Sequence, residues 1–359
     1  MIDTVRFRTP INGNQKKLVE QIGRRTESYD MATGEIYYSF TNVNLKGSWE
    51  TSIQLKVNEK VMINSKQYYM LYVECSLHKL ILGHNCYGGS DDLRKQLVYL
   101  QDILFKELYI FIDLKEITIT RIDYAYVWKL KNQQQSINFI KQLHKVPYRG
   151  KTPKPWKTSS FWKLTNWSMK VYDKLADFQT HDMKKSNFTQ KFYNELPGIL
   201  RFEITFRKKK LEDLHKKKNL QLEDINILLL KEFVDEKILY IEEFIGDKKD
   251  YNRLNTFEKV MNTLNNSKTL KKGMASRLLT TYTIINNIGL DGYQNMTKQN
   301  TTYYRHVKLL KQHGIDVANG TIDLKTKYVQ KLYPEDFKMS ESKYKIESQD
   351  LDNYLMVAI

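Results

Sequence analysis

Two segments of this sequence place an arginine and a carboxylate two residues apart within a strict apolar–polar alternation: Arg121 with Asp123, and Arg201 with Glu203. Such alternation is typical of a half-buried β-strand, in which residues two apart point to the same face. If both strands lie in one sheet, their polar faces place two carboxylates and two guanidiniums on a common floor. Carboxylates suit a divalent metal and guanidiniums suit a phosphate. The alternative interpretation is a pair of exposed cross-strand ion pairs.

A tyrosine at the end of another expected strand is a candidate nucleophile. Tyr172 precedes Lys174 by two residues, and Asp177 follows five residues after the tyrosine. The unperturbed pKa of tyrosine is about 10, so attack at neutral pH requires a nearby cation or a metal-bound phosphate. Lys174 can supply that charge or hold the phosphate, and Asp177 can orient Lys174. The alternative is a surface tyrosine beside a surface lysine.

His84 lies in a glycine-flanked loop and is a candidate metal ligand. Beside Asp123 and Glu203 it completes a mixed nitrogen and oxygen site, with Glu74 as a weaker candidate ligand. Such a donor set favours Mg²⁺ or Mn²⁺ over zinc. The alternative is that a lone histidine serves as a surface or capping residue.

A basic helix is expected near the C-terminal end of the chain, over residues 297–314. Thr297 can cap its N-terminus and Gly314 can end it, while Leu309, Leu310 and Ile315 can pack behind it. Polar and basic side chains of this kind reach bases and phosphates from a recognition helix. The alternative is an ordinary basic surface helix. The DNA-binding candidates on its front are Lys298, Asn300, Tyr304, Arg305 and Lys308.

These residues require an antiparallel sheet with helices on one of its faces. Apolar residues spaced at three and four predict helices over 91–108 and 133–144, and these helices are expected to cover the face opposite the site. A helix over 275–288 is expected to end at Gly289. Alternation predicts strands over 4–8, 36–40, 47–57, 68–77, 117–126, 158–163, 168–172 and 200–207.

The character of the sequence changes after Lys210, where alternating strands give way to leucine, lysine and glutamate at helical spacing. We therefore expect an α+β domain over residues 1–210 and a helical DNA-recognition domain over residues 211–359. The boundary falls in the lysine-rich run at 207–218.

The charge balance favours a polyanionic partner. The 359 residues include 58 Lys and Arg against 41 Asp and Glu, a formal net charge of +17. Nucleic acid is the first candidate, and an acidic membrane surface has only this charge in its favour. No apolar run is long enough to span a membrane, and the N-terminus does not resemble a signal peptide. Two cysteines form no disulfide framework, so we expect a cytoplasmic protein.

The order of these motifs resembles the gene II/X replication initiators of filamentous phages and their plasmid relatives, which are tyrosine nickases related to HUH endonucleases. The resemblance implies that Tyr172 is the nicking tyrosine, with Lys174 close to the phosphate. It also implies that His84, Asp123 and Glu203 stand near a centre that depends on Mg²⁺ or Mn²⁺. The segments that carry the resemblance are residues 2–10, 73–93, 120–123, 172–174, 198–203 and 276–315.

Two details depart from the family pattern. The tyrosine motif of relatives often ends in glutamate, where this chain has Asp177, and the paired histidines of HUH enzymes are absent. The resemblance implies a rolling-circle initiator that nicks one strand at a phage or plasmid origin. It would form a 5′-phosphotyrosyl intermediate and a 3′-hydroxyl primer, would rejoin the strand, and would work with a host helicase and polymerase. The alternative is a non-catalytic, sequence-specific DNA-binding regulator.

Overall fold

The fold is taken from a computed structural model. The structure describes residues 1–29, 31, 36–46, 52–63, 66–82, 84–86, 89–130, 132–181, 190–247, 257–297, 301–315 and 317.

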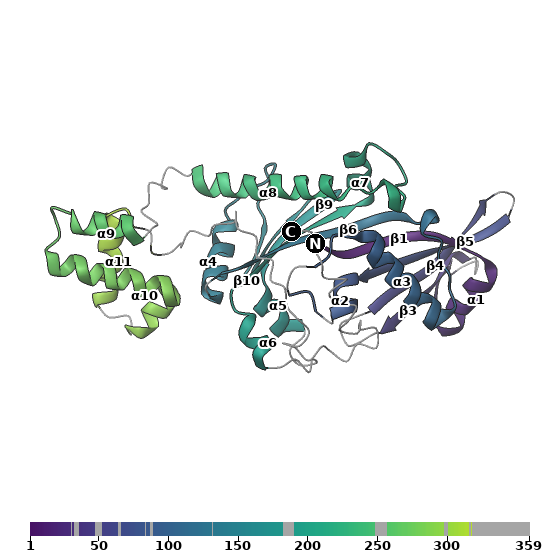
Figure 1. The fold of residues 1–359 in the computed structure, drawn as a ribbon, viewed down its shortest axis with the longest axis horizontal. Helices are drawn as coiled ribbons and strands as arrows, with labels where there is room; N and C mark the ends of the chain where they lie inside the picture. Colours follow the sequence, from purple (N-terminus) through teal and green to yellow (C-terminus); the bar gives the residue numbers. More distant parts are fainter. Residues whose placement is uncertain are drawn as a thin grey trace.

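Ten strands of the described chain form one sheet in the order β2-β3-β4-β5-β1-β6-β10-β9-β8-β7, in which every neighbouring pair is antiparallel. Helices pack on this sheet (Figure 1), so the predicted α+β class is confirmed. The strands are β1 (Ile2–Ile11), β2 (Arg24–Tyr29), β3 (Ile36–Lys46), β4 (Ser52–Ile63), β5 (Lys66–Ser76), β6 (Thr118–Lys129), β7 (Lys154–Trp156), β8 (Ser159–Lys163), β9 (Trp167–Asp173) and β10 (Ile199–Arg207).

One face of the sheet is apolar and carries the main hydrophobic core. The alternation in β10 places Leu200, Phe202, Ile204 and Phe206 on this face, and all four are buried. The helices that cover it include α3 (Leu93–Leu108) and α4 (Gln133–Leu143), as the sequence predicted. The side chain of Asp92 caps α3 by accepting a hydrogen bond from the Lys95 backbone N–H at 2.9 Å.

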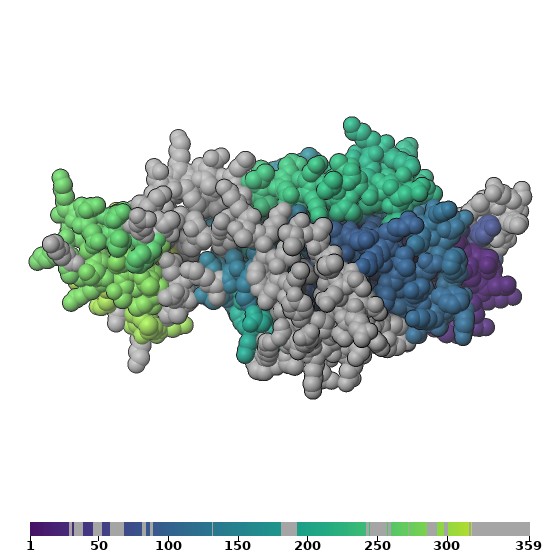
Figure 2. Space-filling view, viewed as in Figure 1, coloured from purple at the N-terminus to yellow at the C-terminus, as the bar shows by residue number. Residues whose placement is uncertain are grey.

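The core under the apolar face continues beyond residue 210. Helix α7 (Lys208–His215) contributes Leu211 to it, and α8 (Ile227–Asp247) contributes Leu230, Val234, Ile238 and Ile241. Lys231 of α8 forms an ion pair with Asp91, just before α3, at 2.7 Å, and the two segments adjoin at the surface in Figure 2. The division into domains at residue 210 stays a prediction, although the sheet's core includes helices on both sides of it.

The opposite face of the sheet is polar, and two short helices between β9 and β10 lie against part of it, α5 (Lys174–His181) and α6 (Gln190–Glu195). Helix α2 (Leu77–Leu82) follows β5, and its Leu77 and Leu80 belong to the main hydrophobic core. Between α6 and β10, Gly198 has φ +82°, and a Cβ there would lie 2.4 Å from the carbonyl oxygen of Leu130. Only glycine meets both requirements. The cluster under α5 and α6 comprises Met1, Cys86, Ala125, Val127, Phe178, Phe192, Leu196 and Ile199.

The remaining helices near the C-terminal end pack around a cluster of their own, which includes Leu278, Tyr282 and Leu310. Two expectations were wrong here. The helix expected to end at Gly289 continues to Met296, so Thr297 ends that helix instead of starting the next one, and its hydroxyl donates to the Tyr293 carbonyl at 2.8 Å. The helices of this C-terminal group are α9 (Phe257–Asn265), α10 (Lys272–Met296) and α11 (Thr301–Gln312). At the other end of the chain, α1 (Gly13–Ile22) lies beside the sheet.

No helix among the described residues is both long enough and apolar enough to cross a bilayer.

Candidate functional site

The two strands that carry an arginine and a carboxylate are neighbours at the centre of the sheet. In the antiparallel register of β6 and β10, Thr205 lies opposite Asp123 and Glu203 lies opposite Ala125. Asp123 and Glu203 therefore point to the same face, one step apart along neighbouring strands. The predicted common floor of two carboxylates and two guanidiniums is confirmed.

Each arginine binds the carboxylate two residues along its own strand. Arg121 donates to both oxygens of Asp123, at 2.8 and 2.5 Å, and Arg201 Nε donates to Glu203 Oε2 at 3.3 Å. Arg121 and Arg201 differ in burial, because the Arg201 side chain is 0% exposed and that of Arg121 is 28% exposed. These pairs are thus no ordinary surface ion pairs, and Arg201 holds its charge inside the protein.

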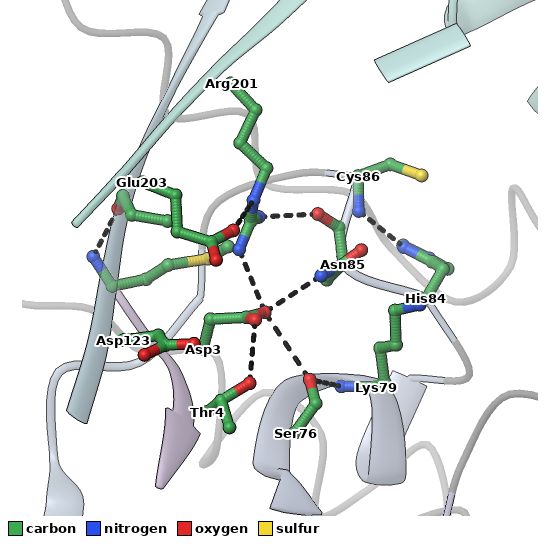
Figure 3. A network of polar contacts seen from close by, with 12 residues as sticks. Asp3, Thr4, Ser76, Lys79, His84, Asn85, Cys86, Asp123, Arg201 and Glu203 are labelled. Carbon is green, nitrogen blue, oxygen red and sulfur yellow. Dashed lines mark hydrogen bonds and ion pairs between the residues drawn. The ribbon is translucent and has the colours of Figure 1, made fainter. Parts of the chain in front are cut away.

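Arg201 is held by a polar network centred on Asp3 (Figure 3). Asp3 lies where the pairing of β1 with β6 shifts register. Its carboxylate lies 2.9 Å from Arg201 Nη2 and accepts hydrogen bonds from Asn85 Nδ2 at 3.0 Å and Thr4 Oγ1 at 3.1 Å. Arg201 Nη1 also donates to the Asn85 backbone carbonyl at 2.7 Å. The network therefore connects β1, β10 and the segment that contains His84.

Burial disfavours the charged form of both aspartates of this face, but their partners differ, and so do their pKa values. Burial disfavours the charged form of Asp3, but Arg201 and Asn85 outweigh it and hold the pKa of Asp3 well below its usual range. Burial raises the pKa of Asp123 to about 7, an effect that Arg121 opposes and Glu203 reinforces. Neighbouring carboxyl groups whose pKa values diverge are typical of sites that hold and transfer protons.

Tyr172 lies on β9 directly opposite Arg201 and joins this network. Its hydroxyl donates to Glu203 Oε2 at 3.3 Å, and Lys170 Nζ lies 4.1 Å from the centre of its ring. The side chain is 5% exposed. Burial raises the pKa of the Tyr172 hydroxyl well above 10, although Arg201 opposes the rise. The hydroxyl is therefore protonated at neutral pH and has one hydrogen-bonded carboxylate that can take its proton.

Lys174, the first residue of α5, is also buried on this side of the sheet. Its Nζ donates to Asp177 Oδ2 at 2.8 Å and lies 5.8 Å from the centre of the Tyr172 ring. Burial opposes the charge on Lys174, but Asp177 raises its pKa above the ordinary value. Asp177 orients Lys174, as expected, and one methylene less than glutamate does not prevent the contact.

His84 is buried against this cluster, with its ring 5.0 Å from that of Phe192. Its Nδ1 accepts a hydrogen bond from the Cys86 backbone N–H at 3.4 Å. Burial, together with His78 and Lys174, lowers the pKa of His84 well below 6.5. His78, which sequence reasoning did not select, is fully buried, and neither of its ring nitrogens has a hydrogen-bond partner among the residues that the structure describes. Burial lowers the pKa of His78 to about 4, so both imidazoles are neutral at neutral pH.

The side chains predicted to bind a metal are His84, Asp123 and Glu203. Among the described residues, no three His, Cys, Asp or Glu side chains are placed to share one ion. The oxygens of Asp123 are bound by Arg121, and Glu203 accepts from Arg201 and Tyr172. A metal ion bound by Asp123 would therefore have to displace Arg121 from this carboxylate. The metal assignment stays a prediction.

Glu74, the weaker candidate ligand, joins two arginines of neighbouring strands. Arg6 Nε donates to Glu74 Oε2 at 2.6 Å, and Arg121 Nη1 donates to Glu74 Oε1 at 2.7 Å. This row of charges runs from β5 through β1 to β6, where Arg121 continues it to Asp123. The polar face is thus electrostatically continuous beyond the residues around Tyr172.

Three of the predicted DNA-binding side chains lie together on one exposed face of α11. Tyr304 is 57% exposed, Arg305 and Lys308 are exposed, and Leu310 and His306 are buried behind them. Gly314 has φ +73°, and the Ile315 N–H bonds to the Leu310 carbonyl, which ends the helix at the expected residue. Lys298 and Asn300 lie outside the described residues.

Asp3 and Asn85 are central to the site, and sequence reasoning gave them no role. Asp3 lies at a shift in strand register, and a one-residue shift reverses the face to which alternation assigns a side chain. The signal that could have identified both residues was their presence in the segments that carry the family resemblance.

One comparison with known protein families identifies the family of this chain. A family model for the N-terminal part of the phage replication-associated protein encoded by gene II matches residues 1–228, which include every strand of the sheet, α7 and the start of α8. A comparison with curated proteins finds no match. Because the family model covers more than half of the chain, the chain belongs to this phage family of replication-associated proteins, which supports a role as a replication initiator.

Proposed function

We propose that this protein initiates rolling-circle replication by nicking one DNA strand at a phage or plasmid origin, with Tyr172 as the nucleophile. The observation that carries the proposal is the contact of the Tyr172 hydroxyl with Glu203, in a register that sets the tyrosine opposite the buried Arg201. A protonated tyrosine in contact with a carboxylate and surrounded by cations has the groups that transesterification requires.

The reaction balances with the side chains of this face. Tyr172 Oη attacks the scissile phosphorus, and its proton passes to Glu203. The bond from phosphorus to the 3′-oxygen breaks, and that oxygen takes a proton from solvent, leaving a 3′-hydroxyl primer and a 5′-phosphotyrosyl enzyme. The charges of Arg121, Lys170 and Lys174 stabilise the developing negative charge. The reverse reaction rejoins the strand. Because Tyr172 is 5% exposed, binding of the strand must uncover the hydroxyl.

Dependence on Mg²⁺ or Mn²⁺ is part of the proposal on the strength of the family resemblance, and no step above uses the ion. A metal would polarise a non-bridging phosphate oxygen. Adduct formation before and after chelation with EDTA tests this requirement. Extension of the 3′-hydroxyl would need a helicase and a polymerase from the host.

The test is a covalent-adduct assay with single-stranded oligonucleotides that tile the replicon encoding the protein. We expect wild type to form a protein–DNA band on a denaturing gel and Tyr172→Phe to form none. Tyr126→Phe is the matched control. Tyr126 lies opposite Phe202 on the apolar face of the sheet, where its ring contacts that of Trp128. An adduct that survives in Tyr172→Phe would move the nucleophile to another residue.

The second candidate is a non-catalytic DNA-binding regulator, which the exposed Tyr304, Arg305 and Lys308 of α11 favour. A regulator would bind origin DNA with α11 and would lose nothing on Tyr172→Phe. Binding of an origin duplex without an adduct from any strand would favour this candidate.

A further inference from the structure

The polar face has a second part, away from Tyr172, on the strands at the other side of the sheet. Here the polar sides of β1 to β5 line an open groove of about 1110 Å³. Its polar lining includes Arg6, Arg24, Asn42, Gln54, Lys56 and Tyr72, and the side chains of Arg6, Arg24, Asn42 and Gln54 are exposed. We call this surface the open groove.

The strand register aligns the side chains of the open groove into a row across the strands. Arg24 lies opposite Asn42, Asn42 opposite Lys56, Lys56 opposite Tyr72, and Tyr72 opposite Arg8. With neighbouring strands about 4.8 Å apart, this row spans roughly 19 Å. Cations therefore lie at both ends and in the middle of the row, with an amide and an aromatic ring between them.

The charge of the open groove fits a polyanion. Its described lining includes three cations, Arg6, Arg24 and Lys56, and a single carboxylate, Glu74. That carboxylate binds Arg6 and Arg121. The charges of Arg24 and Lys56 are therefore not neutralised by it, and the groove keeps a net positive charge. Tyr72 is half-buried, and Lys56 Nζ lies 4.0 Å from the centre of the Phe40 ring. Proteins bind single-stranded nucleic acid with cations that contact its backbone and with aromatic rings that stack on its bases. The open groove has both kinds of side chain.

The open groove is continuous with the proposed nicking site. A second row of side chains runs from Gln54 through Glu74 and Arg6 to Arg121, and Arg121 binds Asp123 at the common floor. A single DNA strand that follows this row out of the groove would reach Asp123 and Glu203, the carboxylates beside Tyr172.

We infer that the open groove binds single-stranded DNA, the segment that flanks the scissile phosphate. The inference rests on the proposed function in that the strand it holds is the strand to be nicked. A span of roughly 19 Å holds on the order of five stacked nucleotides. Every base has a face that can stack on an aromatic ring, and cations contact the backbone whatever the base, so these contacts hold the strand without reading its sequence.

The experiment measures binding of a labelled dT15 strand by fluorescence anisotropy over a range of salt concentrations, using the full chain. Arg24→Ala/Lys56→Ala should weaken binding and reduce the slope of log K against log salt by about 1.4, because each lost phosphate contact removes about 0.7. Tyr72→Ala should weaken binding about tenfold, whereas Tyr72→Phe should keep the stacking ring and the wild-type affinity.

The matched control removes two exposed cations from the other side of the sheet. Arg94→Ala/Lys106→Ala, both on α3, should leave the affinity and the slope unchanged. Equal weakening by both pairs, or unchanged binding in the groove variants, overturns the inference. A loss in the groove variants that is seen for a 15-base-pair duplex but not for dT15 also overturns it and assigns the groove to duplex DNA.

The same variants separate this inference from the proposed function. If wild type forms a covalent adduct while the groove variants bind dT15 normally, the nicking proposal stands and the groove inference fails. If no strand gives an adduct while the groove variants lose dT15 binding and their slope falls, the groove is a site for single-stranded DNA and the nicking proposal fails.

Discussion

The two ends of the polar face have similar residues in opposite environments. The covered end comprises Arg201, Asp3, Tyr172, Lys174 and His84, all buried beneath or beside α5 and the segment after β5. The arginines and amides of the open groove are exposed to solvent, and its tyrosine is half-buried. Burial fixes each charge of the covered end against a partner and shifts pKa values, which is what proton transfer requires. The solvated cations of the open groove can instead neutralise the phosphates of a bound DNA strand, and they can release that strand easily.

The largest difference between the two ends should be in stability. Arg201→Met leaves the buried Asp3 without its ion-pair partner, so we expect the free energy of unfolding to fall by about 3 to 5 kcal/mol. Arg24→Met in the open groove removes the same charge from an exposed side chain and should change it by no more than about 0.5 kcal/mol. Urea denaturation of both variants measures the difference. Equal losses would contradict the contrast between the two ends.

The next effect concerns chemistry. Glu203→Gln removes the acceptor of the Tyr172 proton, so the rate of covalent adduct formation should fall by about 10²- to 10⁴-fold. Binding of the same strand should change little, because the amide still accepts the hydroxyl. Arg24→Ala should show the opposite pattern, with weaker binding and an unchanged rate at saturating DNA. Single-turnover kinetics separate the two, and a rate in Glu203→Gln like that of wild type would rule out Glu203 as the base.

A smaller effect is expected from pH. The folded state holds the pKa of His78 at about 4, below that of an unfolded histidine, so the unfolded chain takes up a proton first as the pH falls. Neutral His78 therefore makes its full contribution to the free energy of unfolding above about pH 6.5. That contribution is lost between about pH 6.5 and about pH 4, by up to about 1.4 kcal/mol per pH unit. His78→Gln should flatten that part of the stability profile, measured by urea denaturation at several pH values. A profile with unchanged slope would contradict the buried, neutral state of His78.

The smallest expected effect lies outside the sheet, on α11. Arg305→Ala/Lys308→Ala should weaken binding of an origin duplex and reduce its salt slope by about 1.8, while binding of dT15 should stay as in wild type. Variants that weaken dT15 and duplex equally would show that α11 and the open groove act on the same strand.

Local patterns in the sequence predicted the strands and the faces of the covered end well. The alternation from Leu200 to Arg207 was sufficient to place Arg201 and Glu203 on the polar side of β10, because burial of one face fixes the phase of a strand. Helices α3 and α4 followed from apolar spacing in the same way. The contact of Tyr172 with Glu203 depends on the pairing of β9 with β10, which no local pattern in the sequence indicates.

Other features depend on tertiary contacts that no local pattern reveals. The lysine-rich run in which we expected the domain boundary contains α7, where Leu211 is buried and Lys209 pairs with Asp213 at 2.9 Å. The helix expected to end at Gly289 continues to Met296, and Tyr293 beyond that glycine is buried, so one glycine, which costs about 1 kcal/mol, does not end the helix. The buried His78 and the position of Asp3 at a register shift have no signature of their own in the sequence.

The measurement that tests the central claim most directly is peptide mapping of the covalent adduct by mass spectrometry. Wild-type protein is trapped on a single strand from its own replicon, digested with trypsin and nuclease, and searched for a peptide that carries a nucleotide. We predict one modified residue, Tyr172, on the peptide that ends at Lys174. A nucleotide on any other residue, with Tyr172 unmodified, would contradict the assignment of the nucleophile.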